Sequence, residues 1–227
     1  MNKACLEFGH RVLSTEDVAG RAVIEVGSLN VNGSLREHVI SLGPASYLGV
    51  DIQAGAGVDA VCDADDVVAR YGREQYDLVI STEVLEHVQH WRAVVSNLKQ
   101  LARPGATLLL TTRSLGFPFH GFPFDFWRYE VEDFRTIFDD LEIRHLEPDT
   151  YEAGVFLKAI RPAQFVERDL SSIALYSMVR RARVLDLPDE EVSRSARFRL
   201  ARLAKTSGLV RWIPGPWKRR LSRTFFG

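Results

Sequence analysis

Short apolar runs alternate with amphipathic stretches from residue 22 to about residue 160. Strands are predicted at 22–26, 46–51, 58–61, 76–81, 106–112, 141–147 and 153–160. Helices are predicted near 34–42, 64–71, 84–102 and 130–139. The runs VIEV, YDLVI and TLLLTT are mostly apolar along their whole length, as expected of strands covered on both faces. This alternation predicts an α/β fold with a doubly wound, mostly parallel sheet.

The end of the pattern predicts one antiparallel strand and a change of structure. Only Glu147–Thr150 separate the last two predicted strands, which is hairpin spacing and too short for a crossover. Beyond them, residues 163–206 look helical and rich in Arg, and 208–227 mix aromatic, proline and basic residues. We therefore expect a domain over 1–162 and a helical, basic C-terminal extension over 163–227.

Composition excludes few classes of protein. The 227 residues can bury one full core, and a hydrophobic fraction of 46% with 26% charged residues is ordinary for a globular protein. No apolar run approaches the roughly 20 residues that cross a bilayer. The first residues have no signal-peptide pattern, so we expect a cytoplasmic protein. Cys5 and Cys62 are expected to be free or buried thiols.

The net charge of −1 conceals an uneven distribution. Residues 167–227 hold 14 Lys and Arg against 6 Asp and Glu, whereas the rest of the chain holds 15 against 24. A basic, aromatic end suits packing on the acidic body of the same subunit or of a second subunit in a homodimer, or contact with the inner face of a membrane. Nucleic acid ranks last because the chain has no recognised nucleic-acid module.

Two strand ends carry the first candidate chemistry. The segment 22–33, AVIEVGSLNVNG, runs from an apolar strand through Glu25 and Gly27 into a polar loop that closes at Gly33. The next strand ends at Asp51. Glycines let the backbone approach a ligand, and an acid at the end of the second strand can accept hydrogen bonds from a ribose. This layout is typical of a nucleoside-binding crevice.

Five motifs in order give the chain a family likeness: VIEVG, the acid ending the second strand, Cys62-Asp63-Ala64, YDLVISTEVLEHV and RPGATLLLTT. Over roughly residues 20–160 the chain resembles class I S-adenosylmethionine-dependent methyltransferases, in particular those of the methyltransferase type 11 group. The resemblance implies a Rossmann-like, seven-stranded sheet with an antiparallel last strand. It also implies S-adenosylmethionine as the cofactor.

The resemblance assigns roles to residues at the strand ends. The methionine part of the cofactor would be lined by Glu25, Gly27 and Ser28. The ribose would be bound by Asp51, and the adenine would be flanked by Asp63 and Ala64. The sulfonium and the substrate would be faced by Ser81 and Glu83.

The loop after the first strand departs from the family pattern, since Asn30 and Asn32 stand where further glycines are usual. Asn tolerates left-handed backbone better than most residues, so we expect the turn to be kept. A nicotinamide dinucleotide is the rival cofactor. Its G-x-G-x-x-G fingerprint seats a pyrophosphate, whereas this chain has no glycine between Gly27 and Gly33. S-adenosylmethionine has no pyrophosphate and tolerates a looser loop.

A first polar cluster, Glu83, Glu86 and His87, follows the fourth strand. On a helix, residues i, i+3 and i+4 share one face, so the three side chains would converge on a divalent cation, with Mg²⁺ and its waters as the expected occupant. The pattern E-x-x-E-H also resembles the metal site of ubiquinone-pathway O-methyltransferases and of the plant small-RNA 2′-O-methyltransferase. The alternative is a metal-free site in which Glu caps the helix and His packs on the cleft.

A second cluster lies in the loop 120–129, after the fifth strand, where open α/β sheets bind substrates. His120 is the predicted general base because imidazole titrates near neutrality. Asp125 would orient this base or complete the metal site, and Arg128 would fix the loop or hold an anionic group. The phenylalanines of the loop are interpreted as packing. The loop is loosely similar to loops of bacterial methyltransferases encoded with glycan-assembly enzymes.

Together these features predict an S-adenosylmethionine-dependent O-methyltransferase. The predicted acceptor is a saccharide hydroxyl on an oligosaccharide, a polysaccharide precursor or a glycosylated metabolite, and the Arg- and Ala-rich chain suits an actinobacterial enzyme. The alternative acceptors are a phenol or quinone-type small molecule and an RNA 2′-hydroxyl. The altered glycine loop motivates a further alternative, a methyltransferase-like binding subunit without turnover, against which Glu25, Asp51 and Asp63 argue.

Overall fold

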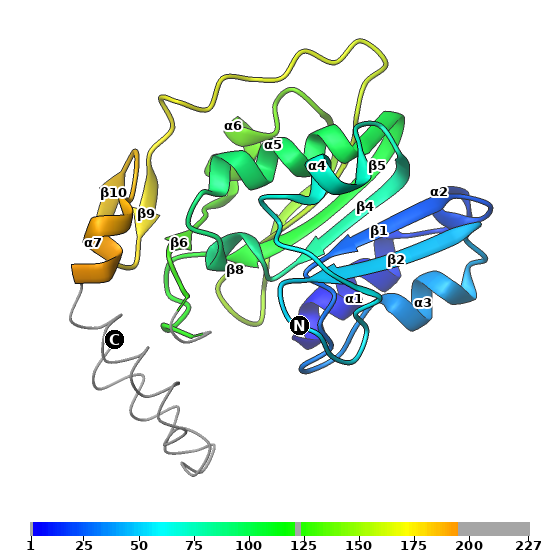
Figure 1. Ribbon diagram of the computed structural model, residues 1–227, viewed down its shortest axis with the longest axis horizontal. Coiled ribbons are helices and arrows are strands. Elements are labelled where there is room, and N and C mark those ends of the chain that lie inside the picture. The colour runs from blue at the N-terminus through cyan, green and yellow to red at the C-terminus, as the bar shows by residue number, and fades with distance from the viewer. Residues whose placement is uncertain (1, 121–123, 195–227) are drawn as a thin grey trace.

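A seven-stranded sheet runs through the centre of the molecule (Figure 1). The computed structural model describes residues 2–120 and 124–194. In spatial order the strands are β3 (Ala60–Val61), β2 (Ser46–Asp51), β1 (Ala22–Val26), β4 (Tyr76–Thr82), β5 (Ala102–Arg113), β8 (Gly154–Ile160) and β7 (Glu142–Pro148). The strand β8 is antiparallel to both of its neighbours, and the other pairings are parallel. The predicted sheet with an antiparallel last strand is confirmed.

Helices cover both faces of this sheet (Figure 1). One face carries α1 (Lys3–Val12), α2 (Thr15–Val18) and α3 (Arg36–Ser41), and the other carries α4 (Val67–Tyr71), α5 (Trp91–Leu101) and α6 (Val131–Ile137). Strand β1 serves both layers, because Val23 packs toward α1 and α3 while Ile24 packs toward α4 and α5. Both side chains are fully buried, which explains the continuously apolar strand.

The helix predicted over 84–102 is interrupted in the structure. Glu83 has a left-handed backbone with φ +59, and its N–H donates to the carbonyl of Thr111 on β5 at 2.9 Å. This turn draws the chain back against the sheet, and only a short 3-10 turn, η1 (Leu85–His87), follows it. The regular helix α5 therefore begins at Trp91.

The prediction of a helical extension is wrong for most of its described part. Beyond β8 the chain forms β9 (Leu175–Ser177) and β10 (Ala182–Val184), which join β6 (Trp127–Arg128) in a small antiparallel sheet. Helix returns only at α7 (Asp189–Arg194). The cause is non-local, because β9 pairs with a strand far back in the chain and buries Leu175. The residues 195–227 lie outside the described chain.

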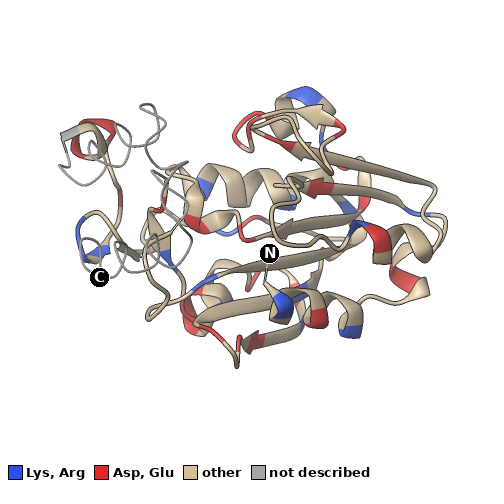
Figure 2. Ribbon diagram, turned by 90° about the horizontal axis from the view of Figure 1, so that it is seen from below, with Lys and Arg blue, Asp and Glu red and all other residues tan. Residues whose placement is uncertain are grey.

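The described extension is also not basic. Residues 167–194 hold 5 Lys and Arg against 6 Asp and Glu, so the basic excess falls beyond residue 194. Blue and red segments alternate along this part of the ribbon (Figure 2), and Arg168, Arg180 and Arg183 each form an ion pair with an acid. Among the described residues, no helix has the length and apolar character to cross a membrane.

Candidate functional site

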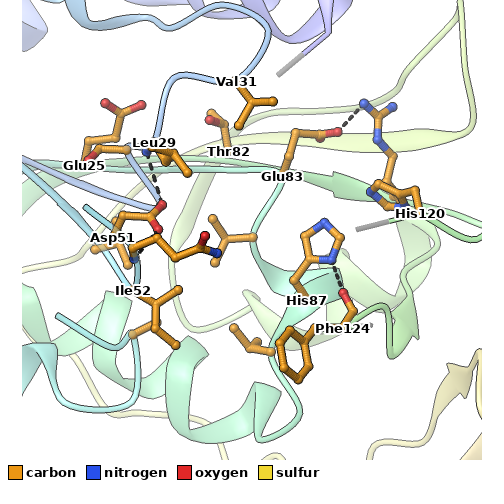
Figure 3. Close-up of a pocket in the computed structure, with 18 of the residues that line it drawn as sticks. Glu25, Leu29, Val31, Asp51, Ile52, Thr82, Glu83, His87, His120 and Phe124 are labelled. Atoms are coloured by element: carbon orange, nitrogen blue, oxygen red, sulfur yellow. Dashed lines mark hydrogen bonds and ion pairs between the residues drawn. The ribbon is translucent and has the colours of Figure 1, made fainter. Parts of the chain in front are cut away.

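A cavity of about 1190 Å³ opens at the edge of the sheet where β1, β2 and β4 end (Figure 3). Glu25, Leu29 and Asp51 lie toward one part of it, and Glu83, His87 and His120 lie toward another. The first part is called here the carboxylate end and is defined by Glu25, Asp51 and Asp63. The second is called the histidine end and is defined by Glu86, His87 and His120.

Asp51 lies where β2 ends and lines the carboxylate end as predicted. Its two oxygens accept hydrogen bonds from the backbone N–H of Leu29, at 3.1 Å, and of Gln53, at 2.9 Å. These bonds fix the carboxylate at the mouth of the crevice. Because each carboxylate oxygen accepts more than one hydrogen bond, Asp51 can still bind the hydroxyl groups of a ligand.

Glu25 lines the same end but is only 1% exposed. Burial raises the pKa of this carboxyl to about 7, and the hydroxyl of Tyr47, which donates to it, offsets only part of the effect. Glu25 therefore stands close to the midpoint of its titration at neutral pH. A cationic group on a ligand would favour its ionised form.

Gly27 allows the chain to pass tightly between β1 and the turn at Glu83. Its φ is +86, and a Cβ atom there would lie 2.0 Å from Cγ2 of Val84. The N–H groups of Gly27 and Ser28 both donate to the carbonyl of Val50, at 2.8 and 3.0 Å. Both residues line the cavity, and so do the predicted Asp63 and Ala64.

The expected left-handed asparagines are not found. The described non-glycine residues with left-handed backbone are Glu74, Glu83 and Arg181. Asn30 instead supports the loop with its side chain, whose Oδ1 accepts from the N–H of Gly33 at 2.9 Å. Side chains of this type commonly stabilise turns by such local bonds. Asn32 lines the cavity without this backbone conformation.

Ser81 does not face the cavity as predicted. It is 1% exposed and is absent from the cavity wall, which receives Thr82 and Glu83 from the end of β4. Successive strand residues point to opposite faces, so an error of one residue along the strand assigns the wrong side chain to the cavity. Thr82 was not predicted from the sequence, and neither were Asn2 and Lys3, which the start of α1 brings to the rim of the cavity.

Glu86 and His87 lie together as predicted, but the prediction that Glu83 joins them is wrong. It assumed one helical face, whereas the left-handed turn at Glu83 sends this side chain toward Arg113, with which it forms an ion pair (Figure 3). Glu83 also accepts from the hydroxyl of Thr111 at 3.1 Å. Burial and the charge of Glu86 raise the pKa of Glu83 to about 7.

A different set of side chains converges instead, and it includes His120. Oε1 of Glu86 lies 3.6 Å from Nε2 of His120 and 3.8 Å from Nε2 of His87. The three potential ligand atoms all lie within 4.8 Å of one another. The histidine end therefore joins the two polar clusters, and it does so through His120 and not through Asp125 as a ligand.

Each of these three side chains is oriented by a further hydrogen bond. Nδ1–H of His87 donates to the carbonyl of Phe124, and Nδ1–H of His120 donates to Asp125 at 3.2 Å. The other oxygen of Glu86 accepts from the hydroxyl of Thr112 at 2.8 Å. A carbonyl can only accept, so the neutral ring of His87 has its lone pair on Nε2. The two Nε2 atoms and Oε1 of Glu86 are thus aimed at one point.

Asp125 holds His120 as predicted, and the loop is held in turn. The carboxylate is fully buried and accepts from the backbone N–H of His120, at 2.8 Å, as well as from its ring. The guanidinium of Arg128, which is 1% exposed, donates to both oxygens of Asp125. Arg128 fixes the loop and is not available to a substrate anion.

The charges at the histidine end do not favour His120 as a general base. Burial alone would lower the pKa of its ring, but the hydrogen bond to Asp125 and the charges of Asp125 and Glu86 raise this pKa to about 9. At neutral pH and without a bound cation the ring is then protonated, so it would have to release this proton before it could bind a cation or accept a proton from a substrate. The buried carboxyl of Glu86 keeps its charge, because His87 and His120 lower its pKa to about 2.

Aromatic and charged side chains surround this end of the cavity. Phe117, Phe124 and Phe126 line it, and Phe124 is 51% exposed, so it is not simply a core residue as interpreted from the sequence. Arg113 lies over the ring of Phe117 at 4.1 Å. Glu152 adds a half-exposed carboxylate to the same wall.

Residues 1–147 match a protein family described as a methyltransferase domain. A ubiquinone biosynthesis O-methyltransferase from Rhizobium etli is 28% identical over 49% of this chain and 48% of its own length. A phthiotriol/phenolphthiotriol dimycocerosates methyltransferase from Mycobacterium tuberculosis is 30% identical over 46% of this chain and 42% of its own. The chain spans about half the length of the curated relatives it matches.

Solved structures give the same fold. An S-adenosylmethionine-dependent methyltransferase from Mesorhizobium loti superposes with a TM-score of 0.53 at 16% identity, covering 70% of this chain and 99% of that one. The magnesium protoporphyrin IX methyltransferase of Synechocystis, with S-adenosylhomocysteine bound, gives a TM-score of 0.53 at 19% identity over 69% of this chain and 81% of its own. At these identities the likeness concerns the fold.

Proposed function

Because the chain belongs to the class I S-adenosylmethionine-dependent methyltransferases, we propose that it transfers a methyl group to a hydroxyl of an acceptor held at the histidine end. One observation carries the proposal: the crevice at the carboxylate end and the rings of His87 and His120, which converge with Oε1 of the buried Glu86, belong to the wall of the same cavity. A methyl donor and an acceptor can therefore be held side by side, and such positioning is the main requirement of methyl transfer.

The carboxylate end fits S-adenosylmethionine, which when bound supplies a methyl group on a positively charged sulfur. Asp51 would accept from the ribose hydroxyls, and Asp63 and Ala64 would flank the adenine. Val31 and Ile52 are 69% and 61% exposed although they are apolar, and both line the cavity. A bound cofactor would remove these two side chains from water, which favours binding.

The methionine part of the cofactor would lie along Glu25, Gly27 and Ser28. The passage there is narrow, since any side chain at Gly27 would meet Val84. Ser28 also lines this passage, and its buried Oγ, which lies beside Gly49, has no hydrogen-bond partner among the described residues.

The histidine end fits a divalent cation, which when bound supplies positive charge that lowers the pKa of a neighbouring hydroxyl. Oε1 of Glu86 is buried without a hydrogen-bond partner among the described residues, and a cation would satisfy it. Two imidazoles and one carboxylate suit Zn²⁺, Mn²⁺ or Fe²⁺ better than the expected Mg²⁺, which prefers oxygen ligands. In this proposal His120 is a ligand that Asp125 orients, and not a base.

The proposed acceptor is a saccharide hydroxyl. Phe117, Phe124 and Phe126 offer flat apolar faces for the carbon side of a sugar ring, and Glu152 and Asn2 offer polar groups for its other hydroxyls. A site with apolar walls and a few polar groups holds a ligand in one orientation. A phenolic acceptor is the second candidate, which is favoured by the same aromatic side chains and by the similarity to the ubiquinone biosynthesis O-methyltransferase of Rhizobium etli.

The proposal is tested by methyl transfer from labelled S-adenosylmethionine to saccharides, phenols and RNA. The protein is first treated with EDTA and then supplied with Mn²⁺, Zn²⁺ or Mg²⁺ in turn. We expect turnover of a saccharide to fall at least tenfold after EDTA and to return with Mn²⁺ or Zn²⁺. Full turnover in EDTA would remove the cation from the proposal, and turnover of phenols alone would reassign the acceptor.

Glu86→Gln is the matched variant, because it keeps the shape of the side chain and removes its charge. It should abolish the response to Mn²⁺ while the affinity for S-adenosylhomocysteine, measured by calorimetry, stays within about twofold. Glu132→Gln, an exposed change on α6, serves as the control. Failure of the wild-type protein to bind S-adenosylhomocysteine would contradict the methyltransferase activity itself and favour a binding subunit without turnover.

A further inference from the structure

The strap, defined as residues 163–194, contributes no side chain to the cavity wall, yet it lies against the loop that carries Phe124 and Asp125. We propose that the strap is a positioning element for the acceptor site, and that its strand β9 holds this loop so that His87 and His120 face Glu86. The inference rests on the proposed function, since it assigns the strap to that same site. Figure 1 shows β9 and β10 returning beside β6 after the chain has crossed the molecule.

The first contact is a main-chain ladder. Trp127 and Arg128 of β6 pair with Ser177 and Tyr176 of β9, and the N–H of Met178 donates to the carbonyl of Phe126 at 2.8 Å. In the described part of the chain, β6 belongs to no other sheet. On its inner side the loop is held by the N–H of Phe126, which donates to the carbonyl of Glu86 at 2.8 Å. The loop is thus fixed between η1 and the strap.

The second contact fastens the strap to the body of the protein. The guanidinium of Arg92 on α5 donates to the carbonyls of Leu170 and Ile173, both at 2.7 Å, and pairs with Asp186. The side chain of Gln89 donates to the carbonyl of Leu187 at 3.0 Å. These residues follow η1 directly, so the same short segment carries two of the converging atoms and anchors the strap.

The third contact connects the ladder to the cation ligands. The residue before Phe126 is Asp125, which orients His120, and the residue before that is Phe124, whose carbonyl orients His87. A shift of the Phe126–Arg128 backbone would therefore displace the hydrogen-bond acceptors of both imidazoles at once. In the described chain, β1 and β2, which carry the cofactor residues, pair with strands of the central sheet and not with β9. The strap should thus affect the histidine end and spare the carboxylate end.

Ser177, the last residue of β9, is the residue to change, because it is fully buried and its hydrogen bonds hold the turn that follows. Its Oγ accepts from the N–H groups of Val179 and Arg180 at 3.2 and 3.3 Å, and its carbonyl accepts from Arg181 at 2.7 Å. Ser177→Ala removes the Oγ bonds and loosens the turn that presents Met178. Met178→Pro is the stronger variant, since it removes the N–H that donates to Phe126. Arg180→Ala is the control, because this exposed side chain on the same turn pairs with Glu191.

The test combines hydrogen exchange with two titrations of the full-length protein. Amide exchange is measured in peptides covering residues 117–128, and Mn²⁺ and S-adenosylhomocysteine are titrated separately by calorimetry. For Ser177→Ala and Met178→Pro we expect at least tenfold faster exchange in this segment and at least tenfold weaker Mn²⁺ binding. The affinity for S-adenosylhomocysteine should remain within about twofold, and Arg180→Ala should resemble the wild type in all three measurements.

The possible outcomes distinguish the positioning role of the strap from cation binding itself. Unchanged exchange in 117–128 for both variants would overturn the inference, because the loop would then be held without the strap. An equal loss of Mn²⁺ and S-adenosylhomocysteine binding would also overturn it, since the effect would be general unfolding. If the wild-type protein takes up no Mn²⁺, the cation site fails, and the exchange rates alone decide whether the strap positions the loop.

Discussion

Burial of the Glu25 carboxyl group costs folding stability but prepares the site for a cationic ligand. Glu25 sits at the end of β1 beside the bound position proposed for the cofactor, and its near-complete burial raises its pKa to about 7 from 4.5. Between pH 4.5 and about pH 7, Glu25 is therefore protonated in the folded, ligand-free protein and ionised in the unfolded chain. A ligand with a cationic group would instead favour the ionised form of Glu25. Its charge would offset the cost of burying the carboxylate, so the buried acid favours binding of such a ligand in the crevice.

The stability of the ligand-free protein should depend on pH through Glu25. The folded-state pKa is the higher one, so the folded protein binds more protons and the free energy of unfolding falls as pH rises from about 4.5 to about 7. The loss is on the order of 3 kcal/mol. Glu25→Gln should remove this part of the slope, as measured by urea unfolding at pH 5 and pH 8. Glu37→Gln, an exposed change on α3, should keep the wild-type slope, and parallel slopes for all three proteins would contradict the assignment.

Site residues at the ends of β1 and β2 could be predicted from the sequence, whereas those at the end of β4 and in the turn after it could not. Asp51 and Gly27 follow apolar strands whose ends are visible in the sequence, and both line the cavity. The direction of Glu83 depends on one left-handed backbone position that its residue type does not favour. The sequence therefore did not predict that Glu83 turns away from Glu86 and His87, or that His120 lies beside them.

At the scale of elements, continuous apolar runs gave reliable strand positions. The bounds predicted for β1 and β2 are those of the structure, because buried parallel strands need apolar side chains on both faces. The helix α1 was missed although its pattern was present: Ala4, Cys5, Phe8 and Val12 are buried on one face, and Asn2 caps the helix. The interrupted helix at η1 was not predictable, since E-x-x-E-H fits a helix as well as a turn.

Gly27, where the first loop contacts the side chain of Val84, should tolerate substitution poorly. Gly27→Ala adds a Cβ that would lie 2.0 Å from Val84, at a φ of +86. We expect the free energy of unfolding to fall by about 2–4 kcal/mol. About 1 kcal/mol of this comes from the left-handed backbone conformation and the rest from the clash with Val84. In a Val84→Ala background the loss should fall to about 1 kcal/mol, because the clash is gone.

Gly43→Ala is the matched control for this cycle, measured by the same urea unfolding. Its φ is +76, but no atom lies within 4 Å of a Cβ built there, so only the backbone cost of about 1 kcal/mol remains. Equal losses for Gly27→Ala and Gly43→Ala would show that the loop moves away from Val84. The contact would then not define the width of the crevice.

At the scale of the whole molecule, the division at residue 162 does not separate two cores. Leu170, Leu175 and Leu187 of the strap are buried in the same cluster as the side chains of α5 and β5. The sequence suggested a boundary because the strand pattern stops there. Short strands such as β9 are stabilised by a partner elsewhere in the chain, and no local pattern announces this pairing.

Truncation of Leu175 measures how far the strap belongs to the core. This side chain is fully buried in β9, so Leu175→Ala in the full-length protein should lower the free energy of unfolding by about 2–4 kcal/mol. Leu185→Ala, at a position that is 47% exposed in the same strap, should cost less than about 0.5 kcal/mol. A chain ending at residue 162 would lose all three buried leucines, so we expect it to lack a cooperative unfolding transition. If Leu175→Ala proved as mild as Leu185→Ala, residues 1–162 would be an independent domain and the strap an accessory to it.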